Sequence, residues 1–499
     1  MKKVLILSLL FWGFLKITAT ITQIRWGSTT GPLDGLTIDW TSTGTSDQIR
    51  WGYTVNYEMG TFTTTQRPGI SPGSSFFRYA FPIVTPNATL YYQLYDSSNN
   101  SWINQKTFKT APPSNTTNFN FIVQGDSRNN VNTVWKNIAD KVNAKNRAFT
   151  LFTGDITKSG NKVNEYNTWF DNAVDYLADN IIYHAQGNHE VPGSVDYYQT
   201  MFPLPKNNPD NTNLYYSFKY GNALFISLNS EDVQSATSPQ SLWLKSTLEN
   251  AKNDPSITWR IIFYHRPLVN AGKHYGEEIP RRSSWGAWFD EYDVDLILNG
   301  HDHNYQRTKP INFDSSGNVS TTTEYGTSPG KGMCEMICGG LGANLTSQTT
   351  NADVPLTSIF YEGFNYVYVT IDNAVLTAKV YTLGSQPSST APENLLETVI
   401  INKNSTMATH EIRANKQNPI NIYPNPVTDK LNLTYDSQEM GAATIRIYDM
   451  SAREIQSFKV NKNSKNFKTT VDVSTYAKGL YNISFIMGEH KDSTIFIKQ

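Results

Sequence analysis

The chain contains 499 residues, of which 17% are charged and 13% aromatic, and its formal net charge is −1. This length predicts two to four domains, each able to bury a core. The balanced charge leaves no broad basic surface, which argues against nucleic acid as a partner. The aromatic content is also not that of a disordered chain.

The N-terminus has the pattern of a secretory signal peptide. Lys2 and Lys3 precede an apolar stretch from Val4 to Leu15, and a small-residue segment with Ala19 follows. We therefore predict a signal peptide over residues 1–20, cleaved near Ala19. The stretch is too short to span a bilayer, so no transmembrane segment is expected in the mature chain. A retained N-terminal anchor is the alternative, because Lys16 lies close to the apolar residues.

Within residues 21–112, period-two alternation of apolar and polar residues appears in 36–40, 49–53 and 90–94, and Gly, Pro and Ser clusters separate these segments. This pattern predicts an antiparallel β-sandwich that ends at Pro112-Pro113. The region carries no catalytic constellation, which favours a packing role. Carbohydrate binding is the alternative that its aromatic residues leave open.

Five apolar runs in the middle of the chain predict buried strands. The runs span residues 121–123, 149–152, 181–183, 261–264 and 296–298. Each run is followed by a block of metal-binding or turn residues: Gly125-Asp126, Gly154-Asp155, Gly187-Asn188-His189-Glu190, His265 and Gly300-His301-Asp302-His303. Because the ends of such strands converge on one edge of an open α/β sheet, we expect the blocks to meet there.

Two helices are predicted to cover the sheet. Residues 131–144 and 242–251 place apolar side chains near one face of a helix. The residues expected on those faces are Val131, Val134, Ile138, Val142, Leu242, Leu244, Leu248 and Ala251.

The blocks combine carboxylates, an amide and imidazoles, which are ligands that suit Fe, Mn or Zn. Any single block is weak evidence, because Gly-Asp is a common turn and a lone histidine is often structural. Together they predict two metal ions that share one carboxylate, and Asp155 is the residue that we expect to be shared.

The block order, the quartet Gly187-Asn188-His189-Glu190 and the run from Gly300 to Arg307 resemble the calcineurin-like metallophosphoesterases, and within them the purple acid phosphatases. The resemblance covers residues 113–402. Residues 21–112 resemble the fibronectin-like domain that precedes the catalytic domain in plant-type purple acid phosphatases. For residues 113–402 the resemblance implies an α/β (α+β) sandwich with central β-sheets flanked by helices. It also implies that one metal is held by Asp126, Asp155 and His303, and the other by Asp155, Asn188, His265 and His301. His189 would then protonate or stabilise the leaving group.

The chain departs from the purple acid phosphatases at two positions. Lys158 stands where that family has an iron-binding tyrosine, and Arg128 stands where other branches have a histidine. The first metal site is therefore one protein ligand short, which puts ferric iron in doubt. Arg128 either grips a phosphate oxygen or caps its loop at the surface. His274, nine residues after His265, is a candidate to face the substrate, whereas His184 is expected to be structural.

Cys334 and Cys338 are the two cysteines of the chain. In a strand their α-carbons would lie about 13 Å apart. A disulfide requires a separation below about 7 Å, so buried free thiols are expected.

The C-terminal part is predicted to form a linker over residues 403–417 and a second β-sandwich over residues 418–499. Tyr423-Pro424-Asn425-Pro426 and Lys478-Gly479-Leu480-Tyr481 in this part resemble the sorting domain of the type IX secretion system of Gram-negative bacteria. That resemblance implies export through the periplasm to the outer-membrane surface or the medium, with the type IX machinery as a partner. A small adhesive domain is the alternative.

The function expected from these features is hydrolysis of phosphate monoesters of small molecules by metal-bound hydroxide, as in acid phosphatases. The residues expected to act on the substrate are His189, Arg128 and His274. A phosphodiesterase or nucleotidase of the same superfamily is one alternative. A surface binding protein built on a decayed phosphatase fold is the other.

Overall fold

The computed structural model describes residues 21–44, 46–68, 74–97, 99–191, 196–232, 235–327, 330–403, 412–413, 420–449, 453–487 and 490–499. The predicted signal peptide and most of the predicted linker lie outside the described residues. The chain forms two compact units, Met1–Ile412 and Arg413–Gln499, and each is described by itself.

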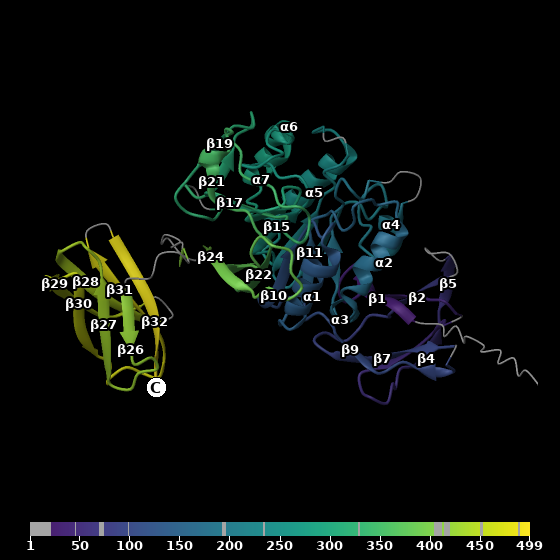
Figure 1. The fold of residues 1–499 in the computed structure, drawn as a ribbon, viewed down its shortest axis with the longest axis horizontal. Helices are drawn as coiled ribbons and strands as arrows, with labels where there is room; N and C mark the ends of the chain where they lie inside the picture. Colours follow the sequence, from purple (N-terminus) through teal and green to yellow (C-terminus); the bar gives the residue numbers. More distant parts are fainter. Residues whose placement is uncertain are drawn as a thin grey trace, which may run out of the picture. The chain divides into compact units, whose positions relative to one another are not determined.

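The centre of the first unit is a pair of mixed β-sheets (Figure 1). One sheet has the order β12-β11-β10-β22-β23-β24, and the two-residue strand β25 (Ile412–Arg413) lies at the unit boundary. The strands of this sheet are β10 (Asn118–Gln124), β11 (Phe149–Phe152), β12 (Ile182–His184), β22 (Asn365–Asp372), β23 (Val375–Thr382) and β24 (Asn394–Asn402). Strands β10, β11 and β12 are parallel, so their carboxyl ends meet at one edge.

The second sheet has the order β13-β14-β15-β16-β20-β17-β21. Its strands are β13 (Tyr216–Tyr220), β14 (Ala223–Ser227), β15 (Trp259–Phe263), β16 (Leu296–Asn299), β17 (Tyr305–Thr308), β20 (Cys334–Cys338) and β21 (Thr357–Tyr361). A small hairpin of β18 (Ile311–Phe313) and β19 (Val319–Thr321) lies outside it. Both cysteines are buried free thiols on β20, which confirms the expectation for them.

The two sheets pack face to face through aromatic rings. The ring centroids of Phe121 and Phe225 lie 5.3 Å apart, and those of Phe149 and Phe218 lie 5.5 Å apart. Aromatic pairs of this kind add to the stabilisation that burial of their apolar area provides. This packing holds the two sheets, and therefore the ends of their strands, in a fixed relation.

Helices and short helical turns surround the sheets. The elements are η1 (Val131–Trp135), α1 (Lys136–Asn143), α2 (Val163–Asp171), α3 (Val174–Ala178), α4 (Tyr197–Met201), α5 (Pro239–Asn253), α6 (Ile279–Arg281), η2 (Arg282–Gly286), α7 (Ala287–Glu291) and η3 (Val354–Leu356). Leu244 and Leu248 of α5 pack with Ile262 and Ile297 on the outer face of the second sheet. Apolar side chains of the first sheet and of the helical residues 131–143 belong to one buried cluster, the larger core of this unit.

One residue of the predicted helix faces was placed wrongly. Leu242 is 56% exposed, whereas Leu244, Leu248 and Ala251 are buried. At 3.6 residues per turn, Leu242 lies more than half a turn away from Leu244 and so cannot share its face. The helix also starts earlier than expected, because Pro239 stands at its first turn and the Ser238 side chain accepts a hydrogen bond from the Ser241 N–H.

Residues 21–109 form two antiparallel sheets, as a sandwich requires, with orders β1-β2-β6-β5 and β4-β3-β7, where β8 and β9 both pair with β7. The strands are β1 (Ile21–Ser28), β2 (Leu36–Ser42), β3 (Gln48–Gly52), β4 (Gly60–Thr63), β5 (Thr65–Pro68), β6 (Ser75–Ala80), β7 (Thr89–Asp96), β8 (Ser101–Trp102) and β9 (Lys106–Lys109). Trp26 and Tyr92 each donate a hydrogen bond to the Ala178 carbonyl, so this region packs directly on α3. Its resemblance to a fibronectin domain stays a prediction.

The second unit is also built from two antiparallel sheets, with orders β26-β27-β30 and β29-β28-β31-β32. The strands are β26 (Ile420–Tyr423), β27 (Lys430–Asp436), β28 (Gly441–Asp449), β29 (Glu454–Lys462), β30 (Asn466–Asp472), β31 (Gly479–Met487) and β32 (His490–Lys498). Leu433, Ile445, Ile483 and Phe485 belong to the core of this unit. A β-rich C-terminal unit of this kind fits the predicted sandwich.

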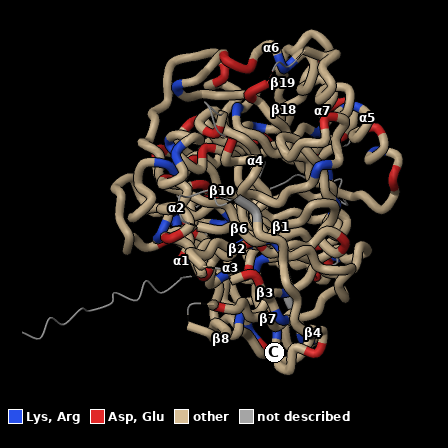
Figure 2. Tube along the Cα trace, turned by 90° about the vertical axis from the view of Figure 1, so that its right-hand side faces the viewer, with Lys and Arg blue, Asp and Glu red and all other residues tan. Residues whose placement is uncertain are grey.

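The trace carries acidic and basic residues in mixed order (Figure 2), which agrees with the balanced charge of the sequence. Within the described ranges, no helix is both long enough and apolar enough to cross a bilayer.

Candidate metal centre

The predicted blocks meet where the carboxyl ends of the strands from both sheets come together. Asp126 follows β10, Asp155 follows β11, and His301 follows β16, and all three have a positive φ of 63°, 57° and 70°. This left-handed backbone is unusual for residues with a Cβ and is concentrated at functional sites. The sharp turns aim these side chains back across the edge of the sheets.

Two glycines make this close approach possible. A Cβ on Gly300 would lie 2.3 Å from Asp126 Oδ2, and one on Gly154 would lie 2.7 Å from His265 Nδ1. Gly154 also has a φ of +101°, which a residue with a side chain would adopt only with strain. The glycines of the blocks therefore clear space for the polar side chains that follow them.

Three predicted ligands surround the Nε2 atom of His265. Asn188 Oδ1 lies 2.9 Å from it, His301 Nδ1 lies 3.2 Å from it, and Asp155 Oδ1 lies 3.4 Å from it. Ligands bound tetrahedrally at about 2.1 Å are separated from one another by about 3.4 Å. The spacing of these four atoms fits the second predicted metal.

Hydrogen bonds from the far side of each ring set which nitrogen faces the centre. His265 Nδ1 lies 2.9 Å from the Thr153 carbonyl, so Nδ1 carries the hydrogen and Nε2 keeps its lone pair. His301 Nε2 lies 2.9 Å from Glu277 Oε2, which leaves His301 Nδ1 as the free nitrogen. Burial and the neighbouring His265 lower the pKa of His301 well below its ordinary value. The His301 ring is thus prepared as a neutral ligand, and the Thr153 carbonyl orients the His265 ring.

The ligands predicted for the first metal are brought together less completely. His303 Nε2 lies 3.7 Å from Asp126 Oδ1, and His303 Nδ1 donates to the Asn344 carbonyl at 2.7 Å. Arg128 lies among these groups. Its Nε donates to Asp155 Oδ2 at 3.0 Å, and its Nη2 lies 3.0 Å from His303 Nε2. The side chain of Lys158 is exposed.

The three residues predicted to act on the substrate also lie around this edge. His189 Nδ1 lies 2.6 Å from the Lys158 carbonyl, and its Nε2 lies 3.8 Å from Asp155 Oδ2. The His274 ring lies 4.2 Å from the His301 ring, and its Nδ1 is 3.0 Å from Asp302 Oδ1. With Arg128, these side chains place cationic and proton-carrying groups beside the predicted ligands.

The carboxylates of the centre are deeply buried and affect one another. Burial and the charge of Asp155 raise the pKa of Asp126 well above its usual value. Burial raises the pKa of Glu190 to about 8, although its carboxylate accepts hydrogen bonds from the backbone of Asp155, Thr157 and Gly187. A cation bound among these carboxyl groups would favour their charged forms and offset the cost of burying them.

Sequence reasoning assigned no role to Glu190 or Glu277. Glu190 ties two ligand-bearing loops together through the backbone bonds given above. Glu277 joins His301 to Arg266, and His274, Glu277 and His301 together form a group that could hold a cation. His274 and Glu277 lie in turn residues, so no helix or strand spacing in the sequence pointed to Glu277.

His184 is enclosed by aromatic rings. Its ring centroid lies 4.0 Å from that of Phe202 and 5.3 Å from that of Phe152, and burial lowers its pKa to about 3. These contacts favour the structural role that was expected.

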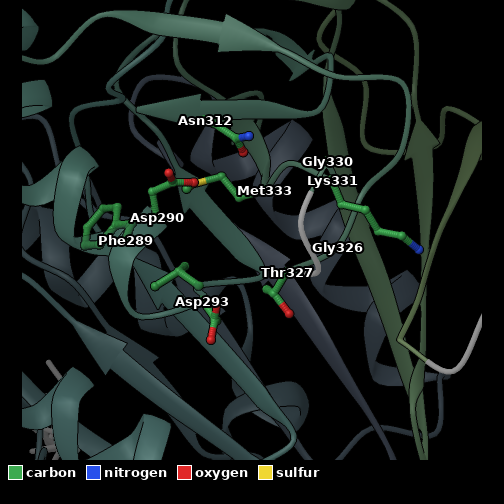
Figure 3. Close-up of a pocket in the computed structure, with 10 residues that line it drawn as sticks. Phe289, Asp290, Asp293, Asn312, Gly326, Thr327, Gly330, Lys331 and Met333 are labelled. Carbon is green, nitrogen blue, oxygen red and sulfur yellow. The ribbon is translucent and has the colours of Figure 1, made fainter. Parts of the chain in front are cut away.

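A separate cavity lies between α7, β18, residues 326–327 and residues 330–333 (Figure 3). Its lining includes Phe289, Asp293, Lys331 and Met333. The lining contains none of the predicted metal ligands.

Two family models match the chain. Residues 120–305 match the calcineurin-like phosphoesterases, and residues 421–499 match the secretion system C-terminal sorting domain. The first match contains the blocks from Asp126 to His303. The second contains both motifs that predicted a sorting domain.

Similar proteins agree with the first match. An uncharacterized protein of Mycobacterium tuberculosis is 29% identical over 41% of this chain and 43% of its own length. Purple acid phosphatase 1 of Ipomoea batatas is 30% identical over 34% of this chain and 38% of its own length. The chain thus covers less than half of the length of these relatives.

A solved structure extends the similarity to the fold. A purple acid phosphatase from yellow lupin (Lupinus luteus) superposes with a TM-score of 0.60, covering 77% of this chain and 75% of that chain. The two are 19% identical, so this likeness concerns the fold alone.

Proposed function

Because the chain contains a calcineurin-like phosphoesterase domain and a type IX C-terminal sorting domain, we propose that it is an exported phosphatase with a two-metal centre. Its substrates are phosphate monoesters of small molecules. The observation that carries this proposal is the placement of three donor atoms, from Asp155, Asn188 and His301, within 3.4 Å of His265 Nε2.

The donor set fits Fe, Mn or Zn, because it combines imidazoles, an amide and carboxylates. Asp155 presents Oδ1 toward His265 and Oδ2 toward the side of His303, so one carboxylate serves both predicted sites. Bound ions would supply Lewis acidity at the phosphoryl oxygens and make a water molecule nucleophilic.

His189 is suited to assist the leaving group. Its Nδ1 is hydrogen-bonded to the Lys158 carbonyl, so Nε2 is the nitrogen that can donate a proton to the leaving-group oxygen. The ring is 26% exposed, which lets a substrate reach it.

Arg128 and His274 are proposed to orient the phosphate. The guanidinium of Arg128 carries a planar set of donors that matches two phosphoryl oxygens. His274 is held through Nδ1 by Asp302, and its Nε2 is the nitrogen proposed to contact the phosphate.

Export through the type IX machinery is the second part of the proposal. The sorting domain supports a route through the periplasm to the outer-membrane surface or the medium. Deletion of residues 418–499 in a host with this machinery should retain the protein in the periplasm, and unchanged export would contradict this part.

A substrate panel tests the proposed chemistry. Purified full-length protein should hydrolyse a monoester such as p-nitrophenyl phosphate faster than bis-p-nitrophenyl phosphate or a nucleotide. A preference for the bis-ester or for nucleotides would favour the other members of the superfamily. Failure to bind any metal in stoichiometric amount would favour a binding protein on a decayed fold.

A further inference from the structure

The side chain of Arg128 is directed into the centre. It is 16% exposed, and it reaches the centre from the loop after β10, two residues beyond Asp126. Its Nε donates to Asp155 Oδ2, and its Nη2 donates to His303 Nε2, both at 3.0 Å. A guanidinium has no acceptor, so His303 Nε2 must be the acceptor in the second contact.

These two acceptors are the atoms that the first metal would use. His303 has one nitrogen lone pair, because its Nδ1 hydrogen is bonded to the Asn344 carbonyl. A lone pair that accepts from Arg128 cannot bind an ion at the same time. The guanidinium is also always charged, and it repels a divalent cation at this distance.

The second predicted site is different. Within the described part of the chain, the hydrogen bonds and ion pairs of His265 Nε2, Asn188 Oδ1, His301 Nδ1 and Asp155 Oδ1 include no arginine or lysine. Arg266 Nη1 donates to Glu277, the carboxylate that also accepts from His301 Nε2, and so lies beside the His301 nitrogen that faces away from the centre. The four donor atoms of this site are therefore ready for an ion without displacement of a protein cation.

We propose that Arg128 is a displaceable counter-cation that imposes an order on metal binding. The site of Asn188, His265 and His301 binds its ion first. The site of Asp126 and His303 binds its ion second, because Arg128 must first leave Asp155 and His303. The displaced guanidinium group can then donate hydrogen bonds to a phosphate group. This proposal rests on the two predicted sites but does not require hydrolysis. It also explains how the carboxylates of the site that lacks a fourth protein ligand stay close together without an ion, because the charge of the arginine offsets theirs.

Titration of the metal-free, full-length protein with Mn²⁺ tests the order, with bound metal measured by equilibrium dialysis and elemental analysis. The wild type should bind two ions in two steps whose affinities differ by at least about tenfold, because two charge-assisted hydrogen bonds oppose the second step. Arg128→Ala should tighten the second step by about tenfold and leave the first step within about twofold.

Two further variants make the result specific. Arg128→Gln removes the charge in a side chain of similar length and should act like Arg128→Ala if the alanine variant folds poorly. Lys158→Ala removes an exposed positive charge three residues after Asp155, and the hydrogen bonds and ion pairs found among the described residues do not join its side chain to a predicted ligand, so both steps should stay unchanged.

Equal affinities in the wild type, or a second step that neither Arg128 variant tightens, would overturn the proposal. A shift of the same size in Lys158→Ala would assign the effect to net charge and would overturn it as well. Ordered binding without hydrolysis of any ester would support the counter-cation and contradict the proposed phosphatase, so the two ideas fail separately.

Discussion

Glu277 Oε2 lies 2.9 Å from His301 Nε2, on the side of the ring that faces away from the other predicted ligands. A carboxylate in this position fixes the tautomer of a metal-binding histidine and raises its basicity. Arg266 contacts the same carboxylate and holds it in place. The pair therefore prepares His301 Nδ1 for an ion.

Replacement of Glu277 should weaken the second predicted metal site. We expect Glu277→Ala to lower its metal affinity by about 10- to 100-fold, because the ring loses its orienting partner. Glu277→Gln keeps an oxygen and should lose less. Glu362→Ala, an exposed carboxylate that bonds only Ser347 among the contacts described, is the matched control. Equal metal affinity in wild type and Glu277→Ala, measured by competition with a chelator, would contradict this role.

His189 should matter for turnover and not for metal content. Because its Nε2 lies 3.8 Å from Asp155 Oδ2 and its ring is proposed to protonate the leaving group, His189→Ala should lower kcat by about 10²- to 10⁴-fold. Elemental analysis should find the same metal content as in the wild type. The loss should be smaller for a substrate whose leaving group is a weak base, such as p-nitrophenolate. A variant that loses its metal instead would identify His189 as a ligand.

His184 should make the protein less stable in acid. Burial lowers the pKa of His184 from 6.5 to about 3. Between these two pH values the unfolded chain binds a proton at His184 and the folded chain does not. The stability is thus complete above pH 6.5 and falls as the pH drops toward 3. Between pH 7 and pH 5 this residue should cost about 2 kcal/mol of unfolding free energy.

His184→Phe tests this contribution, because a phenyl ring can keep the packing on Phe202. Urea unfolding at pH 7 and pH 5 should show a smaller loss of stability on acidification in the variant than in the wild type. The same loss in both proteins would show that His184 does not cause it.

A buried ion pair ties the two sheets together. Arg307 of β17 donates through Nε and Nη2 to the two oxygens of Glu397 of β24, at 3.0 and 2.9 Å. Loss of one partner leaves a buried charge unpaired, so Glu397→Ala should lower the unfolding free energy by about 3–5 kcal/mol. The double variant Arg307→Met, Glu397→Leu should recover most of this loss. A Glu397→Ala protein with wild-type stability would contradict the assigned role of the pair.

The sequence predicted the parts of this molecule that depend on local patterns. The five apolar runs coincide with β10, β11, β12, β15 and β16 to within a few residues. The blocks after them meet because parallel strands share one edge, which is a general property of such sheets. The quartet from Gly187 to Glu190 and the Tyr423-Pro424-Asn425-Pro426 motif both fall within the matched family models.

The parts that escaped prediction depend on contacts between distant segments. The bond from Glu277 to His301 joins residues 24 positions apart, and the bond from Arg128 to His303 joins residues 175 positions apart. Neither follows from a spacing within one element. The docking of Trp26 and Tyr92 on the Ala178 carbonyl is likewise a tertiary contact that alternation of apolar residues does not reveal.

The metal content of Asp155→Ala, measured together with its rate of ester hydrolysis, is the most direct test of a shared carboxylate at a two-metal centre. The circular dichroism spectrum should first show that the variant is folded. We expect elemental analysis to find two ions per wild-type chain and neither ion in the variant, with hydrolysis of p-nitrophenyl phosphate abolished. An Asp155→Ala protein that retains both ions and full activity would contradict the proposed centre.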